Sequence, residues 1–388
     1  MNPVRVHRGR GGRWEARPYM GTDPVTGRRI RPQRSWPADW DEGRAQAACD
    51  EWLAGLAPAL SSSPSKRLAP MLEAYIHDPV RGFSGNTVAT YESALANYIA
   101  PVIGDVPYDA LEPYMVQASY RLALTDRPGR PRVSRTTLRK AHALLAGAYR
   151  SWRKQLGRNP MLDVEPPSPE RTEPFALTEW DQEALADGLV SAMSSDATDA
   201  ANVARRTTAF AAYLALNLAL RCGEACWLDR RAWRRSAHDV HVGGTVVEKP
   251  RLMRRDHPKR GSAGNVAAAP AVEARMAAHV AWQDTWLSRP GPAAPLVTYR
   301  ADGRMARPSD VGREFKRLAA ELGAPEGTTM HTLRHTHATW LIMNGYDMRT
   351  VQERLRHRDV RTTLALYTSV MPGRDASAAR AFTGSIEG

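Results

Sequence analysis

Apolar residues recur at helical spacing along much of this 388-residue chain, most regularly between residues 66 and 165. Two long amphipathic helices are predicted there, with apolar positions at Tyr91, Leu95, Tyr98 and Ile99 in the first and at Leu138, Leu145, Tyr149 and Trp152 in the second. The first helix is expected to begin at a candidate cap, Thr87, and to end at Pro101 and Gly104. The pattern therefore predicts a wholly helical segment.

The first 60 residues follow a different pattern, in which apolar and polar residues alternate. Trp14 and Ala16 fall on one face of a predicted strand, and their polar neighbours fall on the other. The turn sequence GTDPVTGR leads to a second predicted strand that is crowded with arginine, and a helix capped by Asp41 follows. The pattern predicts a small basic sheet packed on one helix.

Two short stretches have the composition of linkers, SSSPSKR at residues 61–67 and EPPSPERTEP at residues 165–174. They separate three predicted domains, which cover residues 1–60, 66–165 and 174–388. The third domain opens with a helix capped by Thr178. It contains the longest apolar run, AFAAYLALNLAL, which is too short to span a bilayer and is typical of a core helix. The predicted fold class is mainly α with small β-sheets (α+β).

The charge balance is basic, with 54 lysines and arginines against 41 aspartates and glutamates and a net charge of +13. Such a surplus points to a polyanionic partner, with nucleic acid ahead of an anionic membrane. Cys49, Cys222 and Cys226 are too few and too spread for a disulfide framework, and no apolar segment follows the basic N-terminus as in a signal peptide. We therefore expect a cytoplasmic protein.

Two clusters of polar residues stand out in the third domain. In LALRCGEACWL, Arg221 and Glu224 lie three residues apart on one predicted helical face. In HTLRHTHATWLIMNG, His331 and Arg334 share a face of a second predicted helix. Each cluster alone is compatible with an ordinary ion pair or a solvated helix face.

A third cluster lies near the C-terminus, in LRHRDVRTTLALYTSV, where His357 precedes Tyr367 by ten residues. A tyrosine at helical spacing among leucines is ordinarily a core residue whose hydroxyl bonds a neighbour. Only the combination of this cluster with the other two suggests that the Tyr367 phenol is a reagent.

Metal binding is the obvious alternative for the histidines. HTLRH has the i, i+4 histidine spacing of a zinc protease helix, but the intervening glutamate is missing and Arg334 would lie close to the cation. The sequence contains no serine or cysteine triad signature, no P-loop and no plausible dinucleotide-binding glycine motif. We therefore expect neither a metal nor a nucleotide cofactor.

Two arginines, two histidines and a tyrosine suit attack on a phosphodiester. Guanidinium groups can clamp the non-bridging oxygens, which gain charge in the transition state. A phenol titrates near ~10, so it needs a base or a strongly positive pocket to become a nucleophile. The departing alkoxide needs an acid, which a lysine beside arginines can supply.

The three clusters resemble, in order and separation, the catalytic boxes of the tyrosine recombinases, the phage integrase family. ALRCGEACWL resembles the box of the first catalytic arginine, HTLRHTHAT resembles the HxLRHT box, and LRHRDVRTTLALYT resembles the box of the nucleophile. Residues 66–165 more weakly resemble the helical core-binding (SAM-like) domain of that family. Residues 1–60 resemble its N-terminal arm-type DNA-binding domain.

The resemblance implies a role for each matching residue. Tyr367 would be the nucleophile, Arg221 and Arg334 would stabilise the phosphate, and Glu224 would support the Arg221 helix. His331 would be a general base or proton shuttle, and His357 would bind the phosphate or orient the tyrosine. The family also has a general-acid lysine in a β-hairpin. Lys249 and Lys259 both qualify, and Lys259 is favoured because PKRGSAGNVAAAP resembles the hairpin turn and the strand after it.

One position departs from the family pattern, since Arg356 stands where glycine is usual before His357. If this residue ends a helix in the left-handed conformation, the side chain costs on the order of 1 kcal/mol. We expect the change to affect the backbone rather than the chemistry.

The resemblance implies a site-specific recombinase of a phage or integrative mobile element, in bacterial cytoplasm and at the nucleoid when bound to DNA. Its partners would be double-stranded attachment sites, three further copies in a homotetramer, and DNA-bending or excision proteins. A type IB topoisomerase-like strand transferase and an inactive DNA-binding regulator are the alternatives.

Overall fold

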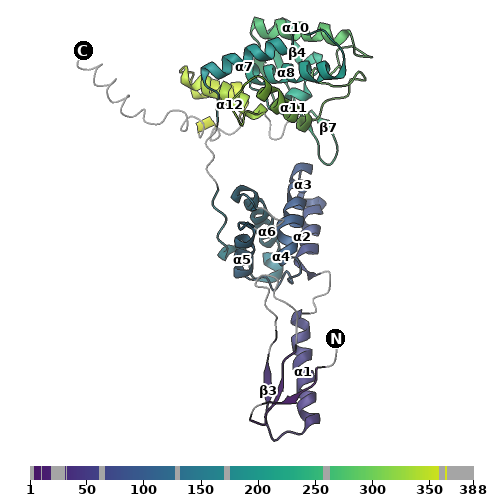
Figure 1. The fold of residues 1–388 in the computed structure, drawn as a ribbon, viewed down its shortest axis with the longest axis vertical. Coiled ribbons are helices and arrows are strands. Elements are labelled where there is room, and N and C mark those ends of the chain that lie inside the picture. Colours follow the sequence, from purple (N-terminus) through teal and green to yellow (C-terminus); the bar gives the residue numbers. More distant parts are fainter. Residues whose placement is uncertain are drawn as a thin grey trace, which may run out of the picture. The chain divides into compact units, whose positions relative to one another are not determined.

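The structure is a computed structural model that describes residues 4–9, 11–18, 31, 33–60, 66–126, 132–169, 175–256, 263–357 and 363–364 (Figure 1). The chain divides into two compact units, Met1–Arg171 and Thr172–Gly388. Each unit is described separately below.

A three-stranded antiparallel sheet and one helix open the first unit. The strands β1 (His7–Arg8), β2 (Trp14–Ala16) and β3 (Arg34–Trp36) pair in that order, and α1 (Glu42–Leu60) follows. The predicted face is confirmed, because Trp14 and Ala16 are buried and Trp14 pairs with Trp36 in register. Asp41 caps the helix as predicted, since its carboxylate accepts from the Arg44 N–H at 2.8 Å. The turn sequence GTDPVTGR lies outside the described residues.

The rest of the first unit is helical, as predicted. Its helices are α2 (Leu68–His77), α3 (Gly85–Ala94), α4 (Ala100–Ile103), α5 (Pro113–Ala123) and α6 (Arg135–Leu156), with 3-10 turns η2 (Pro79–Arg81) and η4 (Pro160–Asp163) and a π-turn η3 (Leu95–Ile99). The apolar side predicted for α6 is confirmed, since Leu138, Leu145, Tyr149 and Trp152 are all buried. Their burial joins α6 to one hydrophobic core shared by these helices.

In this segment the predicted helix start is wrong, and of the two residues predicted to end the helix only Gly104 does so. Ser84, not Thr87, caps α3, because the Ser84 hydroxyl accepts from the Thr87 N–H at 3.3 Å. Pro101 does not end the helix either. The π-turn lets the Ala100 N–H donate to the Leu95 carbonyl, and the helix continues through Pro101 to its end at Gly104.

The second unit is built around α8 (Ala200–Leu218), which is the predicted core helix. The other helices are α7 (Glu179–Ala192), α9 (Cys222–Trp227), α10 (Pro270–Asp284), α11 (Pro308–Glu321), α12 (Met330–Met343) and α13 (Met348–Leu355), with 3-10 turns η5 (Arg230–Ala232) and η6 (Arg235–Ala237). Helices α7, α11 and α12 pack on α8, and Phe210 of α8 and Phe315 of α11 are fully buried in the shared core (Figure 1). Thr178 caps α7 as predicted.

Two small antiparallel sheets lie at one edge of this core. The first contains β4 (Trp233–Arg234), β5 (Asp239–Val242) and β8 (Gly264–Ala267) in that order, and the second contains β6 (Thr245–Val247) and β7 (Met253–Arg255). Val240 of β5 faces Val266 of β8 in register, and both are buried. With few and short strands beside many helices, the predicted fold class is confirmed.

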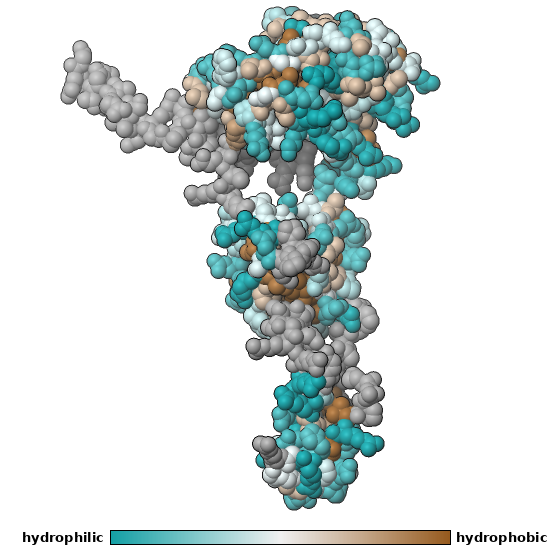
Figure 2. All heavy atoms as spheres, in the orientation of Figure 1, coloured by the Kyte–Doolittle hydropathy of each residue, from teal (hydrophilic) through white to brown (hydrophobic). Residues whose placement is uncertain are grey.

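The surface of the described residues is mainly hydrophilic on the face drawn in Figure 2. None of the helices in the described part of the chain has both the length and the apolar character needed to cross a membrane.

Candidate active site

The connection between α8 and α9 carries the first arginine of the site. Arg221 precedes α9, and its backbone N–H donates to Oε2 of Glu224 at 2.9 Å while its Nη1 donates to Oε1 at 2.6 Å. The Glu224 side chain is only 3% exposed, whereas that of Arg221 is 42% exposed. The Arg221 guanidinium is therefore bound by a buried carboxylate, although its side chain is partly exposed to solvent.

Arg334 reaches the same carboxylate from α12. Thr329 begins this helix by accepting a bond from the Thr332 N–H, so Arg334 falls in the second turn, facing the protein interior. It donates to the carbonyl oxygens of Ala219 and Leu355, and its Nη1 lies 3.7 Å from Oε2 of Glu224. Its side chain is 4% exposed.

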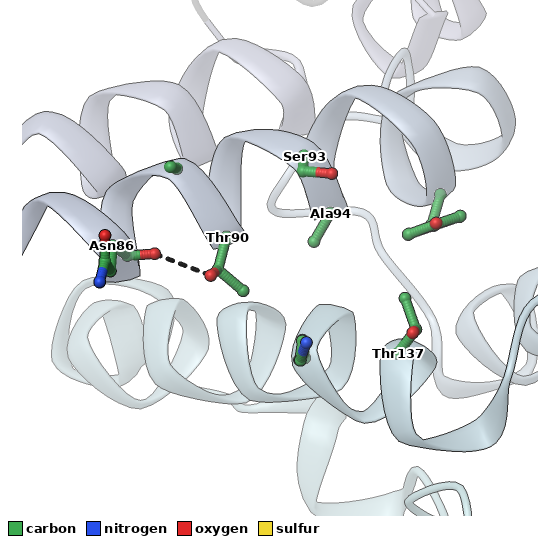
Figure 3. A pocket seen from close by; sticks show the side chains of 8 residues that line it. Asn86, Thr90, Ser93, Ala94 and Thr137 are labelled. Atoms are coloured by element: carbon green, nitrogen blue, oxygen red, sulfur yellow. Dashed lines mark hydrogen bonds between the residues drawn. The ribbon is translucent and has the colours of Figure 1, made fainter. Parts of the chain in front are cut away.

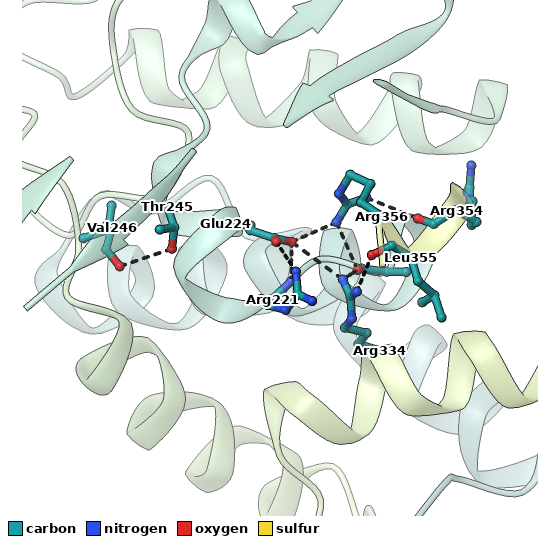
Figure 4. A network of polar contacts seen from close by, with 9 residues as sticks. Arg221, Glu224, Thr245, Val246, Arg334, Arg354, Leu355 and Arg356 are labelled. Carbon is teal, nitrogen blue, oxygen red and sulfur yellow. Dashed lines mark hydrogen bonds and ion pairs between the residues drawn. The ribbon is translucent and has the colours of Figure 1, made fainter. Parts of the chain in front are cut away.

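Arg356 is the third guanidinium of this network (Figure 4). It ends α13 with φ 53° and ψ 42°, so the predicted left-handed conformation is confirmed. Its side chain turns inward, and Nη2 donates to Oε2 of Glu224 at 2.8 Å and to the Ala219 carbonyl at 3.3 Å. We had expected the arginine to affect only the backbone, and this contact of its side chain, across 132 positions of sequence, was not predicted. The signal was available as an arginine where the family has glycine.

The end of α8 explains why cationic side chains gather here. The last carbonyl groups of a helix lack intrahelical partners and carry partial negative charge. The Leu216 carbonyl contacts Nδ1 of His337 at 2.8 Å, and the Asn217 carbonyl accepts from Arg354 at 2.8 Å. Together with the bonds to Ala219, these contacts cover the C-terminal end of α8 with basic groups.

The arginines control the ionisation of Glu224. Burial alone would raise the pKa of this carboxyl group, but Arg356, Arg221 and Arg334 together hold the pKa below its ordinary value. Burial and the neighbouring Arg221 lower the pKa of the Arg334 guanidinium to about 9, so it remains charged at neutral pH. Three guanidinium groups and one carboxylate leave the cluster with a formal charge of +2.

The two predicted histidines lie in the field of these arginines. Desolvation, then Arg334 and Arg221, lower the pKa of His331. This residue lies in the first turn of α12, with its ring 4.7 Å from that of His335. Desolvation, then Arg334, Arg221 and Arg356, lower the pKa of His357 to about 4. Nδ1 of His357 lies 3.0 Å from the Thr363 hydroxyl. Both histidines are therefore neutral at neutral pH and able to accept a proton.

Two of the predicted site residues are not among those that the structure describes. Tyr367 and Lys259 lie outside the described residues. Lys249 lies in the connection between β6 and β7, and Lys259 belongs to the segment between β7 and β8. The strand expected after the Lys259 turn is present, since β8 (Gly264–Ala267) includes the first three residues of NVAAAP. The structure thus brings together Arg221, Glu224, Arg334 and Arg356. His331 and His357 lie close enough for these arginines to lower their pKa values.

A separate polar pocket lies between α3 and α6 in the first unit (Figure 3). Its lining carries the hydroxyl groups of Thr90, Ser93 and Thr137 and the amine of Lys140. The Thr90 hydroxyl donates to the Asn86 carbonyl at 2.7 Å, which fixes part of this surface. Such a lining suits an anionic or hydrogen-bonding partner.

The comparisons with known proteins agree with this site. The model of the phage integrase family matches residues 186–374, a range that includes all of these arginines and histidines and Tyr367. The tyrosine recombinase XerC of Rhodospirillum centenum is 36% identical over 151 residues, which are 39% of this chain and 39% of that protein. XerC of Rhizobium meliloti is 43% identical over 74 residues, which are 19% of this chain and 23% of that protein. The chain thus matches well under half the length of these curated relatives.

Solved structures extend the likeness of the fold over more of the chain. The Tn1549 transposon integrase in complex with transposon right end DNA superposes with a TM-score of 0.67 at 16% identity, covering 83% of this chain and all of that one. A lambda integrase tetramer bound to a Holliday junction gives a TM-score of 0.59 at 16% identity, covering 96% of this chain and 97% of that one. These likenesses concern the fold alone. The sequence matches identify the family, and the chain belongs to the tyrosine recombinases, the phage integrase family.

Proposed function

We propose that this chain is a site-specific DNA recombinase of a phage or integrative mobile element. It cuts and rejoins DNA through a 3′-phosphotyrosyl intermediate and a Holliday junction, without metal or ATP. The observation that carries the proposal is the cluster of Arg221, Arg334 and Glu224 beside two neutral histidines. Positive charge for a phosphate and unprotonated bases for a proton are what phosphodiester attack requires.

In the proposed reaction, the phenolic oxygen of Tyr367 attacks the scissile phosphorus while the bond from phosphorus to the 5′-oxygen breaks. Arg221 and Arg334 stabilise the charge that develops on the non-bridging oxygens. His331 accepts the phenolic proton, and His357 binds the phosphate or orients the phenol. Lys259 gives a proton to the departing 5′-oxygen. The strand then ends in a 5′-hydroxyl, which attacks the phosphotyrosyl bond of a partner strand and completes the exchange.

The proposed partners are double-stranded attachment sites and three further copies of the chain, with DNA-bending or excision proteins as accessory factors. The net charge of +13 supports DNA binding. We assign arm-type binding to residues 1–60, core-site binding to 66–165 and catalysis to 174–388. The hydroxyl groups and Lys140 between α3 and α6 support contact of the second domain with DNA phosphates.

A suicide substrate tests this proposal. The full-length chain is incubated with a nicked duplex that has been selected for binding to it from a random-sequence library. Wild type is expected to form an adduct that survives denaturant, and Tyr367→Phe is expected to form none. Absence of a wild-type adduct, or an undiminished adduct with Tyr367→Phe, would contradict the proposal. Resolution of synthetic four-way junctions then separates a recombinase from a topoisomerase-like strand transferase.

The similarity to XerC proteins makes a chromosomal recombinase of the Xer type the second candidate. Recombination of two plasmids that each carry a chromosomal site, with no element end present, would favour it over the integrase of a mobile element.

A further inference from the structure

We propose that Arg356 is a positioning residue for the phosphate site, which keeps Glu224 neutralised so that Arg221 is free to bind the scissile phosphate. The proposal rests on the proposed function, because it concerns the same site. The Arg356 guanidinium donates to Glu224 and to the main-chain carbonyl groups of Ala219 and Arg354, and we assign it no contact with the phosphate. It acts through the carboxylate that it shares with Arg221.

The contacts around Glu224 show a competition for Arg221. Its Nη1 lies 2.6 Å from Oε1 of Glu224, so the guanidinium that has to face a phosphate is already bound to a carboxylate. A phosphate that draws Arg221 outward weakens this ion pair and leaves a buried negative charge, which is costly without a partner. Arg334 compensates less than a hydrogen-bonded partner would, because its Nη1 lies 3.7 Å from Oε2 and its guanidinium donates to the Ala219 and Leu355 carbonyl groups.

Arg356 gives Glu224 a second cationic partner, and this partner is buried. Its Nη2 donates to Oε2 of Glu224 at 2.8 Å. Arg221 contacts this oxygen through its backbone N–H, whereas its guanidinium binds Oε1. Both side chains of this pair are 3% exposed, so solvent and salt screen the interaction little. Glu224 therefore keeps a close cationic partner when Arg221 moves toward the substrate.

Arg356 also makes the phosphate site more positive than glycine would. With glycine at position 356, Arg221, Arg334 and Glu224 would sum to +1, whereas Arg356 raises the formal sum to +2. A phosphodiester carries one negative charge, so the arginine strengthens the attraction where the charge of the transition state develops. Arg356 has a left-handed backbone with φ 53°, in which glycine would be less strained.

A purely structural role for Arg356 makes different predictions. Its Nη1 donates to the Arg354 carbonyl at 3.3 Å, and its Cγ and Cδ atoms lie 3.5 Å from where a Cβ on Gly264 would stand. If capping and packing were its whole role, any substitution would slow the reaction only as far as it destabilises the fold. A neutral glutamine and a lysine of the same charge would then be equally harmful.

The experiment uses the full-length chain and the nicked suicide DNA, with single-turnover adduct formation measured from pH 5 to 9 and the thermal unfolding midpoint recorded for each variant. Arg356→Gln is expected to slow adduct formation at saturating DNA by about tenfold or more, with the half-saturating DNA concentration little changed. Arg356→Lys keeps the charge and is expected to stay within about threefold of wild type. Arg349→Gln, an exposed arginine of the same helix, is the matched control and is expected to behave as wild type.

The pH profile separates the charge from the packing. Without Arg356, Glu224 loses a neighbour that favours its ionised form, so its pKa rises. A protonated Glu224 no longer competes for Arg221, so the rate difference between Arg356→Gln and wild type is expected to shrink as the pH falls. A rate and a profile equal to wild type would overturn the inference, and so would a lysine variant as slow as the glutamine variant. If glutamine prevents folding, the lysine variant and the double variant Glu224→Gln/Arg356→Gln, in which both charges are absent, decide the question. The double variant is expected to match Glu224→Gln alone, and a further loss would contradict us. A wild type that forms no adduct would instead refute the proposed function.

Discussion

The Nη2 atom of Arg356 lies 2.8 Å from Oε2 of Glu224, although 132 positions separate the two residues in the sequence. The contact joins the end of α13 to the first turn of α9. Arg221 and Arg334 meet the same carboxylate from α9 and α12. Glu224 is thus the common partner of every arginine that we place in or behind the phosphate site.

The stability of the second unit should depend strongly on this carboxylate. Glu224→Ala leaves buried guanidinium groups without their counter-charge, which is expected to cost about 3–5 kcal/mol of unfolding free energy in urea. Glu353→Ala is the control, because Glu353 forms an exposed ion pair with Arg349 and should cost no more than about 1 kcal/mol. Equal losses for the two variants would contradict the account of the network.

The pKa of His357 gives a pH dependence with a definite sign. Its folded-state pKa is about 4, below the ordinary value of 6.5, so the unfolded chain binds a proton that the folded chain refuses. Its contribution to stability is therefore fully present above pH 6.5 and falls as the pH drops toward 4. Histidine NMR signals recorded from pH 8 to 4.5 should show His357 neutral down to about pH 5. A midpoint near 6.5 would show that neither burial nor the arginines act on this ring.

Arg221 offers the clearest separation of chemistry from stability, because its side chain is 42% exposed. Arg221→Ala is expected to slow adduct formation by about 10²–10³-fold, as the loss of one transition-state donor does elsewhere. Arg313→Ala, which removes an exposed arginine of α11, should leave the rate unchanged. A rate loss in Arg221→Ala that is matched by Arg313→Ala would point to general DNA affinity instead.

Local features of the site could be predicted from the sequence. The i, i+3 spacing of Arg221 and Glu224 predicted their ion pair, and one helix was predicted to carry both His331 and Arg334. These predictions succeeded because helix geometry fixes which neighbours meet. The contact of Arg356 with Glu224 could not be predicted in this way, because it depends on how α9 and α13 pack at the end of α8.

The errors in the fold have similarly local causes. Ser84 and Thr87 both carry a hydroxyl that can cap a helix, and spacing alone did not distinguish them. The π-turn that carries the helix past Pro101 is a feature of backbone hydrogen bonding, which the apolar spacing of Leu95, Tyr98 and Ile99 does not reveal. Strand β1 has two residues, which is too short for an alternating pattern to appear.

The choice of general acid remains a prediction that chemistry can decide. Lys259→Ala is expected to stall cleavage of a normal 5′-oxygen leaving group, and a 5′-thiol leaving group, which needs no proton, should restore it. Lys249→Ala is the matched control and should cleave both substrates at the wild-type rate. If the thiol rescues Lys249→Ala instead, Lys249 is the acid.

The central claim is that Tyr367 attacks DNA, and the most direct test is to locate the covalent bond. The adduct formed on the suicide substrate is digested with nuclease and trypsin and analysed by mass spectrometry. Cleavage after arginine yields a peptide of residues 362–374 in which Tyr367 is the only tyrosine. The account predicts a nucleotide on this peptide at Tyr367. A nucleotide on any other residue would contradict it.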